Sequence, residues 1–266
     1  LSTEESLLTR LFQYRFTAGS GLEGHSFGNL FLSALTAITG NLETAITASS
    51  RVLAVQGQVV PATNVDVRLW AELENGERIE GDSNIGHAPS PIVRLGCQPE
   101  RPPALPRALE AIASADLILL GPGSLYTSLL PNLLVPELVN AIGRSRAPRL
   151  YICNLMTQPG ETDGLDVRGH LRAIEAQLAS LGINQRLFTA VLAQDDLGAS
   201  PLVEHYRSRG AEPVACDADD LRRDGYDVTQ APLQGARPTA TLRHDSRSLA
   251  LAVMRFYRSH RRDKDQ

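Results

Sequence analysis

A chain of 266 residues is long enough for one large α/β domain or two small ones, and it can bury a substantial core. Hydrophobic residues make up 42% of the chain and charged residues 21%, as in an ordinary globular protein. The formal net charge of -4 gives no electrostatic footprint for nucleic acid or for an anionic membrane.

The cysteines and the hydropathy restrict where the protein works. Cys97, Cys153 and Cys216 are odd in number and far apart, which indicates neither a disulfide framework nor a zinc site. No apolar run reaches the roughly 20 residues of a membrane span. We therefore expect a cytoplasmic protein without a membrane span, in which the basic residues 258–266 form a frayed, solvated tail.

The chain starts at Leu1 within LSTEESLLTRLFQYRF, which is typical of the middle of a helical region. We therefore expect that a native N-terminal segment precedes this sequence. Residues 24–39, GHSFGNLFLSALTAIT, begin with a glycine-rich turn and continue as a helix. The residues that follow are predicted to remain helical and then to form a strand near residues 52–55.

Residues 59–79 alternate between apolar and polar side chains, which predicts a half-exposed β-hairpin with Asn75-Gly76 at its turn. We expect this hairpin to lie at the edge of a sheet. The next stretch, rich in Pro and Gly, predicts a loop with one short strand at residues 92–95.

From residue 105 onward, helices and buried strands alternate. Strands are predicted at residues 116–120, 149–154, 187–194 and 211–216, and the helical stretch after the first strand is broken at Pro131 and Pro136. This order favours right-handed crossovers and a parallel sheet with helices on its faces. Ligands of such sheets bind beyond the carboxyl ends of the strands, so the loops after residues 120, 153 and 194 are the candidates.

The first candidate loop is Gly121-Pro122-Gly123-Ser124, between a buried strand and the start of a helix. Glycines let the backbone approach a ligand, and the free N–H groups of a first helical turn favour an anion. Hydroxyl groups on the same turn could add donors; they belong to Ser124, Tyr126, Thr127 and Ser128. The alternative is a tight strand-to-helix turn with a serine cap, because the segment matches neither the dinucleotide nor the Walker pattern.

The second candidate loop is CNLMTQPGETDG, residues 153–164, at the end of the next buried strand. It crowds polar side chains into one place, namely Asn154, Thr157, Gln158, Glu161, Thr162 and Asp163. Thr162 or Asp163 could serve only as a helix cap. Two polar loops at neighbouring strand ends favour a binding site over two unrelated turns.

A third glycine-rich helix start, GLEGHSFGNL, contains His25 and Asn29. His25 could contact a phosphate or cap the helix, and Asn84 is a further polar candidate on another loop. GHSFG also reads G-x-S-x-G, but the nucleophile elbow needs a buried strand before it and FTAGSGLE is not one. We therefore expect no catalytic nucleophile here.

Metal ligation is weakly indicated, because the six histidines are scattered. Asp163, Asp195 and Asp196 could hold Mg²⁺ beside a diphosphate, but solvated loop acids are the commoner outcome. We expect no resident metal, and Mg²⁺ only if the protein is a transferase.

Three long motifs together resemble a known family: LFQYRF…GLEGHSFGNLFLSALT, GPGSLYTSLLPNLLVPEL and YICNLMTQPGETDG. They are similar to the gluconeogenesis-factor (YvcK-like) branch of the family that includes the 2-phospho-L-lactate transferase (CofD-like). The resemblance implies a Rossmann-like α/β fold, which we expect as a single domain over residues 1–266, in a cytoplasmic bacterial protein. It also implies a nucleotide-diphosphate ligand.

In the gluconeogenesis-factor branch, the resemblance implies a UDP-sugar ligand, UDP-N-acetylglucosamine or UDP-glucose. The implied role is regulatory: support of cell shape and wall synthesis on gluconeogenic carbon, with a cell-wall synthesis protein as a candidate partner. In the transferase branch, a phospholactyl group moves from a guanosine diphosphate carrier to a deazaflavin. A dimer through the exposed edge of the hairpin region is left open.

Carried over by position, the resemblance places a set of residues around the nucleotide diphosphate: Gly121, Gly123, Ser124, Tyr126, Thr127, Asn154, Thr157 and Gln158, with His25 and Asn29 opposite. Arg243 in LRHDS and, more loosely, Tyr206 match residues that hold the UDP-sugar, although core packing is the alternative for Tyr206. Ser246 lies where the family can carry a phosphorylated threonine, which makes Ser246 a candidate phosphorylation site. The family's opening strand and Gly-Gly-Gly-Thr-Gly loop have no match here, and we expect them to belong to the missing N-terminal segment.

Overall fold

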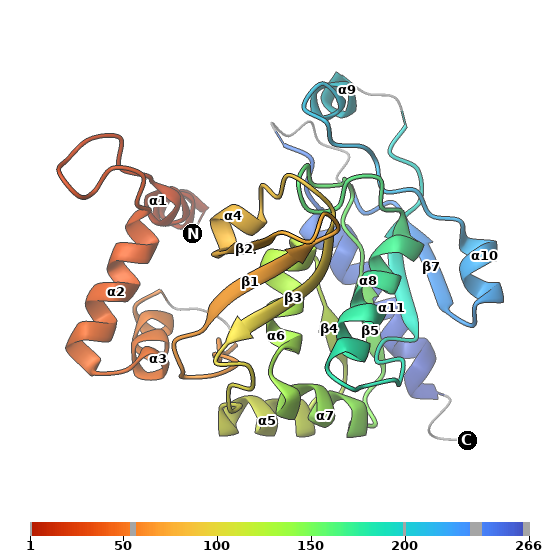
Figure 1. Cartoon of the computed structure of the whole chain (residues 1–266), viewed down its shortest axis with the longest axis horizontal. Coiled ribbons are helices and arrows are strands. Elements are labelled where there is room, and N and C mark those ends of the chain that lie inside the picture. The colour runs from red at the N-terminus through yellow and green to blue at the C-terminus, as the bar shows by residue number, and fades with distance from the viewer. Residues whose placement is uncertain (1, 54–56, 199–200, 235–240, 263–266) are drawn as a thin grey trace. The chain divides into compact units, whose positions relative to one another are not determined.

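The computed structural model of the chain describes residues 2–53, 57–198, 201–234 and 241–262 (Figure 1). Its contacts divide the chain into two compact units, Leu1–Asn64 and Val65–Gln266. The single domain expected over residues 1–266 stays a prediction, and the two units are described separately.

The first unit is helical, with α1 (Ser2–Gln13), α2 (Phe27–Thr39) and α3 (Leu42–Val52). Side chains cap two of these helices, because Ser26 accepts a hydrogen bond from the Asn29 N–H and Asn41 accepts one from the Thr44 N–H. The helices expected in this region are confirmed. The strand expected near residues 52–55 is wrong at Val52, which still belongs to α3, and residues 54–56 lie outside the described ranges.

The second unit begins with an antiparallel sheet in the order β2-β1-β3, made of β1 (Arg68–Leu73), β2 (Arg78–Glu80) and β3 (Ile92–Gln98). The hairpin between β1 and β2 turns at Asn75-Gly76, as predicted, with Gly76 in the left-handed region at φ 81°. Within the described residues, this hairpin belongs to a separate sheet. The short helix α4 (Asp82–Ile85) leads from β2 toward β3.

Trp70 of β1 lies opposite Gly96 of β3, and this pair fixes the surface of the antiparallel sheet. A Cβ atom on Gly96 would lie 2.1 Å from the Trp70 ring, so only glycine leaves room for the indole. The guanidinium carbons of Arg78 and Arg94 lie 4.1 and 5.0 Å from the ring centroid. The indole is therefore held by a glycine and two cations.

A parallel sheet follows in the order β4-β5-β6-β7, with β4 (Ile118–Leu120), β5 (Arg149–Ile152), β6 (Ala190–Gln194) and β7 (Asp227–Ala231). Helix α5 (Pro106–Ala113) precedes β4. The helices between and after the four strands are a π-helical turn (Leu125–Leu129), α6 (Leu130–Leu133), α7 (Pro136–Arg144), α8 (Val167–Ser180), α9 (Pro201–Arg207), α10 (Ala218–Arg223) and α11 (Ser246–Arg262). The predicted α/β class with a mostly parallel sheet is confirmed.

Helices cover both faces of the parallel sheet, because successive strand residues point to opposite sides. Tyr151 packs in the cluster that contains α8, whereas Leu150 and Ile152 pack in the cluster that contains α11. The helices α8 and α11 accordingly lie on opposite faces (Figure 1). None of the described helices has the length and apolar character that a bilayer crossing requires.

The fourth strand predicted at residues 211–216 is wrong, because the fourth strand of the sheet is β7. Residues 211–214 run beside the loop after β5 instead. The Thr157 N–H donates to the Glu212 carbonyl at 2.7 Å, and the Val214 N–H donates to the Leu155 carbonyl at 3.0 Å. These partners satisfy the backbone of a short apolar run outside the sheet.

Candidate nucleotide-sugar site

A hollow of about 700 Å³ lies beyond the carboxyl ends of β4 and β5, where the order of strands predicts a ligand site. Its walls come from the loop after β4, the loop after β5, helix α9 and the segment before α11. The lining residues are Pro122, Gly123, Ser124, Ser128, Asn154, Leu155, Met156, Thr157, Gln158, Tyr206, Leu242, Arg243 and His244. Seven of the sequence-predicted site residues therefore share one hollow: Gly123, Ser124, Asn154, Thr157, Gln158, Tyr206 and Arg243.

Two amide side chains join the loop after β5 to the glycine loop. The Asn154 amide pairs with Gly123 in both directions, because Nδ2 donates to the Gly123 carbonyl at 2.8 Å and Oδ1 accepts from the Gly123 N–H at 3.2 Å. The Gln158 Nε2 donates to Ser124 Oγ at 2.8 Å. Since this bond uses Ser124 as an acceptor, the hydroxyl proton of Ser124 stays free to donate to a ligand.

Gly121 contributes to the site through the backbone. Its φ of 93° lies in the left-handed region, and a Cβ atom would lie 2.6 Å from the carbonyl oxygen of Ile152 in β5. Glycine is therefore required here because the neighbouring strand passes close by. Gly121 does not line the hollow.

The first turn after the glycine loop is π-helical and divides its side chains between two sides. Ser124 and Ser128 line the hollow, whereas the Tyr126 N–H and the Thr127 hydroxyl donate to the Glu161 carboxylate at 3.2 and 2.9 Å. The Tyr126 hydroxyl donates to the Ile92 carbonyl. Burial, together with the Glu161 carboxylate, raises the pKa of Tyr126 to about 12.

The sequence predicts that the first turn of this helix binds an anionic ligand. In the structure, the carboxylate of a buried side chain, Glu161, occupies that position. Glu161 is 7% exposed and occupies the end of the turn where N–H groups attract negative charge. The backbone N–H of Tyr126 and the hydroxyl of Thr127 donate to this carboxylate, and neither residue lines the hollow. Their contact with a nucleotide diphosphate stays a prediction.

Thr157 has a double role in the loop after β5. Its N–H donates to the Glu212 carbonyl at 2.7 Å, and its hydroxyl oxygen accepts from the Glu212 N–H at 2.8 Å. Thr157 is 4% exposed, so its side chain mainly ties the loop to residues 211–214 while forming part of the wall.

Arg243 and His244 complete the hollow from the segment before α11. Arg243 is exposed and, across the ranges the structure describes, forms no hydrogen bond or ion pair. The His244 ring bonds through Nε2 to the Cys153 carbonyl at 3.1 Å, and burial lowers the pKa of His244. An Nε2–H donor leaves Nδ1 as the acceptor of the neutral ring.

His244 was missed from the sequence, as were Met156 and Leu242. The histidine directly follows Arg243 in LRHDS, so its position next to a predicted site residue could have marked it as a candidate. The contact that makes it part of the wall, however, joins residues 91 positions apart.

Four predicted residues lie elsewhere. Asn84 is on α4, and its Nδ2 donates to the Glu80 carbonyl at 2.8 Å, outside the hollow. His25 and Asn29 belong to the first unit, where they flank the start of α2. Ser246 is the exposed first residue of α11. Their roles in ligand binding and phosphorylation stay predictions.

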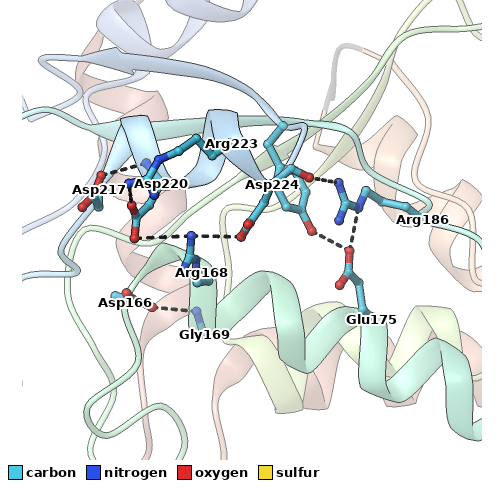
Figure 2. A network of polar contacts seen from close by, with 10 residues as sticks. Asp166, Arg168, Gly169, Glu175, Arg186, Asp217, Asp220, Arg223 and Asp224 are labelled. Carbon is cyan, nitrogen blue, oxygen red and sulfur yellow. Dashed lines mark hydrogen bonds and ion pairs between the residues drawn. The ribbon is translucent and has the colours of Figure 1, made fainter.

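A polar network fixes α8, which follows the loop after β5 (Figure 2). Asp166 caps α8 by accepting from the Gly169 N–H at 2.7 Å. Arg168 then reaches two carboxylates associated with α10, Asp220 at 3.4 Å and Asp224 at 3.0 Å. At the far end of α8, Glu175 pairs with Arg186 at 2.9 Å. The network links α8, which follows the loop after β5, to α10 and to Arg186.

The loop acids considered for Mg²⁺ accept hydrogen bonds from the backbone. Asp163 accepts from the Gly160 N–H, Asp195 from the Asp196 N–H, and Asp196 from the Gly198 N–H. Within the described residues, no group of three or more His, Cys, Asp or Glu side chains could hold a metal ion.

Comparison with known proteins identifies the family. Residues 1–234 match the model of a family described as 2-phospho-L-lactate transferase CofD. A gluconeogenesis factor of Bacillus subtilis is 39% identical over 250 residues, covering 94% of this chain and 77% of the relative. One from Halalkalibacterium halodurans is 41% identical over 254 residues, covering 96% and 77%.

One relative extends much further beyond this chain. A protein of Nostoc sp. (strain PCC 7120) is 51% identical over 257 residues, which cover 97% of this chain but 56% of the relative. A crystal structure of a UPF0052-family protein from Bacillus halodurans aligns with a TM-score of 0.83 at 40% identity, covering 93% of this chain and 78% of the other. The chain therefore belongs to the CofD-like family and, within it, to the branch of the gluconeogenesis factors.

Proposed function

We propose that this protein binds a UDP-sugar in the hollow beyond β4 and β5 and acts as a regulator without turnover. The observation that carries the proposal is that one hollow brings together Arg243, which has no partner among the described residues, and amide, hydroxyl and aromatic side chains from four separate stretches of the chain.

The charge of the hollow suits a diphosphate. Arg243 is free of partners among the described residues, and no aspartate or glutamate is among the described residues that line the hollow. A guanidinium group can donate two parallel hydrogen bonds to phosphate oxygens. The free hydroxyl proton of Ser124 provides a further donor to the same hollow.

The size and the remaining walls suit a nucleotide sugar. A hollow of about 700 Å³ falls within the range of small-molecule sites. Tyr206 on α9 offers a half-buried aromatic ring for a base or a sugar, and Nδ1 of His244 offers an acceptor for a hydroxyl group.

The hollow offers little for covalent catalysis. Across the described ranges, no hydrogen bond joins Ser124 or Ser128 to His244, so neither hydroxyl has the base that would activate it. Binding without turnover fits a regulatory role. The names of the relatives then support a role in growth on gluconeogenic carbon, which we extend to cell shape and wall synthesis through a cell-wall synthesis protein as partner.

Calorimetric titration with UDP-N-acetylglucosamine tests the proposal. We expect saturable binding, weakened about 10- to 100-fold in Arg243→Ala, because a hydrogen bond to a charged group contributes about 1.5–3 kcal/mol. Arg172→Ala, which removes an exposed arginine on α8 outside the hollow, is the matched control and should bind like the parent. No heat at millimolar ligand would refute the proposal.

The transferase reading is the second candidate, because the matching family model carries the description of a 2-phospho-L-lactate transferase. In that reading, the hollow would position the guanosine diphosphate carrier, and catalysis would depend mainly on positioning and on stabilising the charge of the transferred group. Incubation with the carrier, a deazaflavin and Mg²⁺, followed by mass spectrometry, distinguishes the two. Formation of the phospholactyl-deazaflavin would refute the proposal of a regulator without turnover and show that the protein is a transferase.

A further inference from the structure

Helix α11 has a buried side that holds it on the parallel sheet. Ala252, Val253 and Phe256 are buried in the cluster that contains Leu150 and Ile152 of β5. The frayed tail expected from residue 258 onward is therefore wrong as far as Arg262, where α11 ends. The side of the helix that faces away from the sheet is thus presented on a rigid element.

That opposite side carries a regular stripe, which we call the α11 stripe. Its members recur at i, i+4, i+7, i+11 and i+14: Arg247, Leu251, Met254, Arg258 and Arg261. All five are exposed, and the apolar pair at the centre stands out, with Leu251 52% and Met254 43% exposed. This spacing is the one by which helices pack against one another along a seam.

The charge of α11 has a single sign. From Ser246 to Arg262, the helix contains no aspartate or glutamate, although Asp245, directly before the helix, interacts with Arg247. Arg258 and Arg261 form no ion pair or hydrogen bond with any described part of the chain, and Arg255, beside the stripe, is likewise unpaired and exposed. The protein as a whole is acidic, with a net charge of -4, so this concentration of unpaired cations is local.

The stripe ends at a second hollow, of about 770 Å³, between α5, α7 and α11. Helix α11 supplies Tyr257, His260 and Arg261 to its wall, and α7 supplies Arg144. Arg261 belongs to both features. A helix lying along the stripe would reach the mouth of this hollow, where a side chain beyond the end of the stripe can be received.

We propose that the α11 stripe docks an acidic amphipathic helix of a partner protein. Apolar side chains of that helix cover Leu251 and Met254, and carboxylates at its two ends pair with Arg247 on one side and with Arg258 and Arg261 on the other. The pairing of the partner's carboxylates with the arginines at both ends of the apolar centre sets the register of the two helices and selects an acidic partner.

Two other occupants fit less well. A second copy of this chain, paired through the same stripe, brings arginines against arginines, which disfavours association. An anionic bilayer needs a broad apolar face to insert, but the apolar side of α11 already packs on the sheet and only two large apolar side chains remain outside.

Fluorescence anisotropy with a labelled synthetic helix tests the proposal. The probe has leucines at the a and d positions of its middle turns and glutamates near both ends. We expect the parent protein to bind it and the affinity to fall with added salt. Arg258→Glu/Arg261→Glu should weaken binding by about tenfold or more, because each reversal replaces attraction by repulsion. Leu251→Ala/Met254→Ala should also weaken binding of the labelled helix. The loss in this variant measures the apolar contribution separately from that of the charges.

Arg101→Glu/Arg172→Glu is the control, since it changes the net charge equally at exposed positions on β3's following loop and on α8. It should bind as the parent does, and melting by circular dichroism verifies that every variant is folded. Absence of binding up to about millimolar peptide, or unaltered binding by the reversed variant, would overturn the proposal. Binding to phosphatidylglycerol vesicles without binding to the peptide would overturn it in favour of a lipid surface.

Discussion

The side-chain amide of Asn154 pairs with both peptide groups of Gly123, at 2.8 and 3.2 Å, and so joins the loops that follow β4 and β5. The two loops behave as one wall because of this pair. The contact joins residues 31 positions apart, and it holds the glycine loop in place before any ligand arrives.

Asn154→Asp should loosen this wall. The carboxylate loses the donor to the Gly123 carbonyl and places two acceptors face to face, which we expect to lower the free energy of unfolding by about 1–3 kcal/mol. Asn154→Ala removes the same bonds without adding charge. Urea unfolding measures the stability of both, and calorimetry should show weaker UDP-sugar binding for the aspartate than for the alanine, because a carboxylate repels a diphosphate. Equal affinities would contradict a diphosphate at this position.

Gly121→Ala should be more damaging than an ordinary glycine substitution. It combines a positive φ with a Cβ only 2.6 Å from the Ile152 carbonyl. Gly164→Ala is the matched control, since Gly164 has a φ of 70° but no atom within 4 Å of its Cβ. We expect the control to lose about 1 kcal/mol or somewhat more from the backbone alone. Gly121→Ala should lose clearly more, and similar unfolding midpoints would argue against the close approach of β5.

Much of this arrangement could be predicted from the sequence, because it depends on local patterns. The buried runs before Gly121 and Asn154 predict adjacent parallel strands, and parallel strands bring their following loops to one edge. Which residues of the first helical turn line the hollow and which contact Glu161 could not be predicted in this way. Whether Tyr126 faces a ligand or a protein carboxylate depends on Glu161, 35 residues further on, and local spacing carries no information about that contact.

The error at residues 211–216 has a similar physical origin. A short, mostly apolar run such as AEPVAC fits a buried strand or any buried segment whose backbone groups have partners. Here Thr157 and Leu155 supply those partners, whereas the true edge strand β7 is partly polar and gives a weak signal. The local sequence pattern does not show whether residues 211–216 or β7 forms the fourth strand. Contacts with distant parts of the chain determine which of them joins the sheet.

Removal of the buried carboxylate tests its structural role. Glu161→Gln keeps the size of the side chain but replaces one acceptor by a donor opposite the Tyr126 N–H or the Thr127 hydroxyl. We expect a loss of about 1–3 kcal/mol in the free energy of unfolding. Thr127→Val removes one donor only. In the double variant the two losses should not add, and strict additivity in urea unfolding would exclude direct coupling.

One buried and one half-buried histidine predict a stability that falls in acid. Burial lowers the pKa of both His170 and His244 below the usual value of 6.5 in the folded protein, although carbonyl groups of Asp166 and Cys153 oppose the shift. Between the unfolded pKa and the lowered folded pKa, the unfolded chain binds more protons, so stability is full above about pH 6.5 and declines as the pH falls.

Unfolding by urea at neutral pH and at about pH 5 measures this decline. Among the described residues, His170 Nε2 has no hydrogen-bond partner, and the side chain is fully buried, so His170→Leu should reduce the pH dependence. A variant with the parent's full pH dependence would show that the decline comes from other groups.

Trp70 makes the antiparallel sheet observable, because it is the only tryptophan in the sequence. Gly96→Ala places a methyl group 2.1 Å from the indole, so the ring must leave its position between the glycine and the two arginines. We expect a shift in the emission spectrum and a loss of about 1–3 kcal/mol. Gly86→Ala, whose nearest contact is an ordinary 3.5 Å, should leave the spectrum unchanged. An unaltered spectrum in Gly96→Ala would contradict the stacking.

The order in which the walls of the first hollow occur along the chain has a consequence for biosynthesis. The glycine loop and Asn154 are translated early, but Arg243 and His244 come about ninety residues later. In a growing chain, the hollow therefore lacks the wall formed by residues 242–244 until the segment before α11 has left the ribosome. A small molecule that needs contacts from both ends can be retained only by a chain translated beyond residue 244, so truncated products would not compete for it.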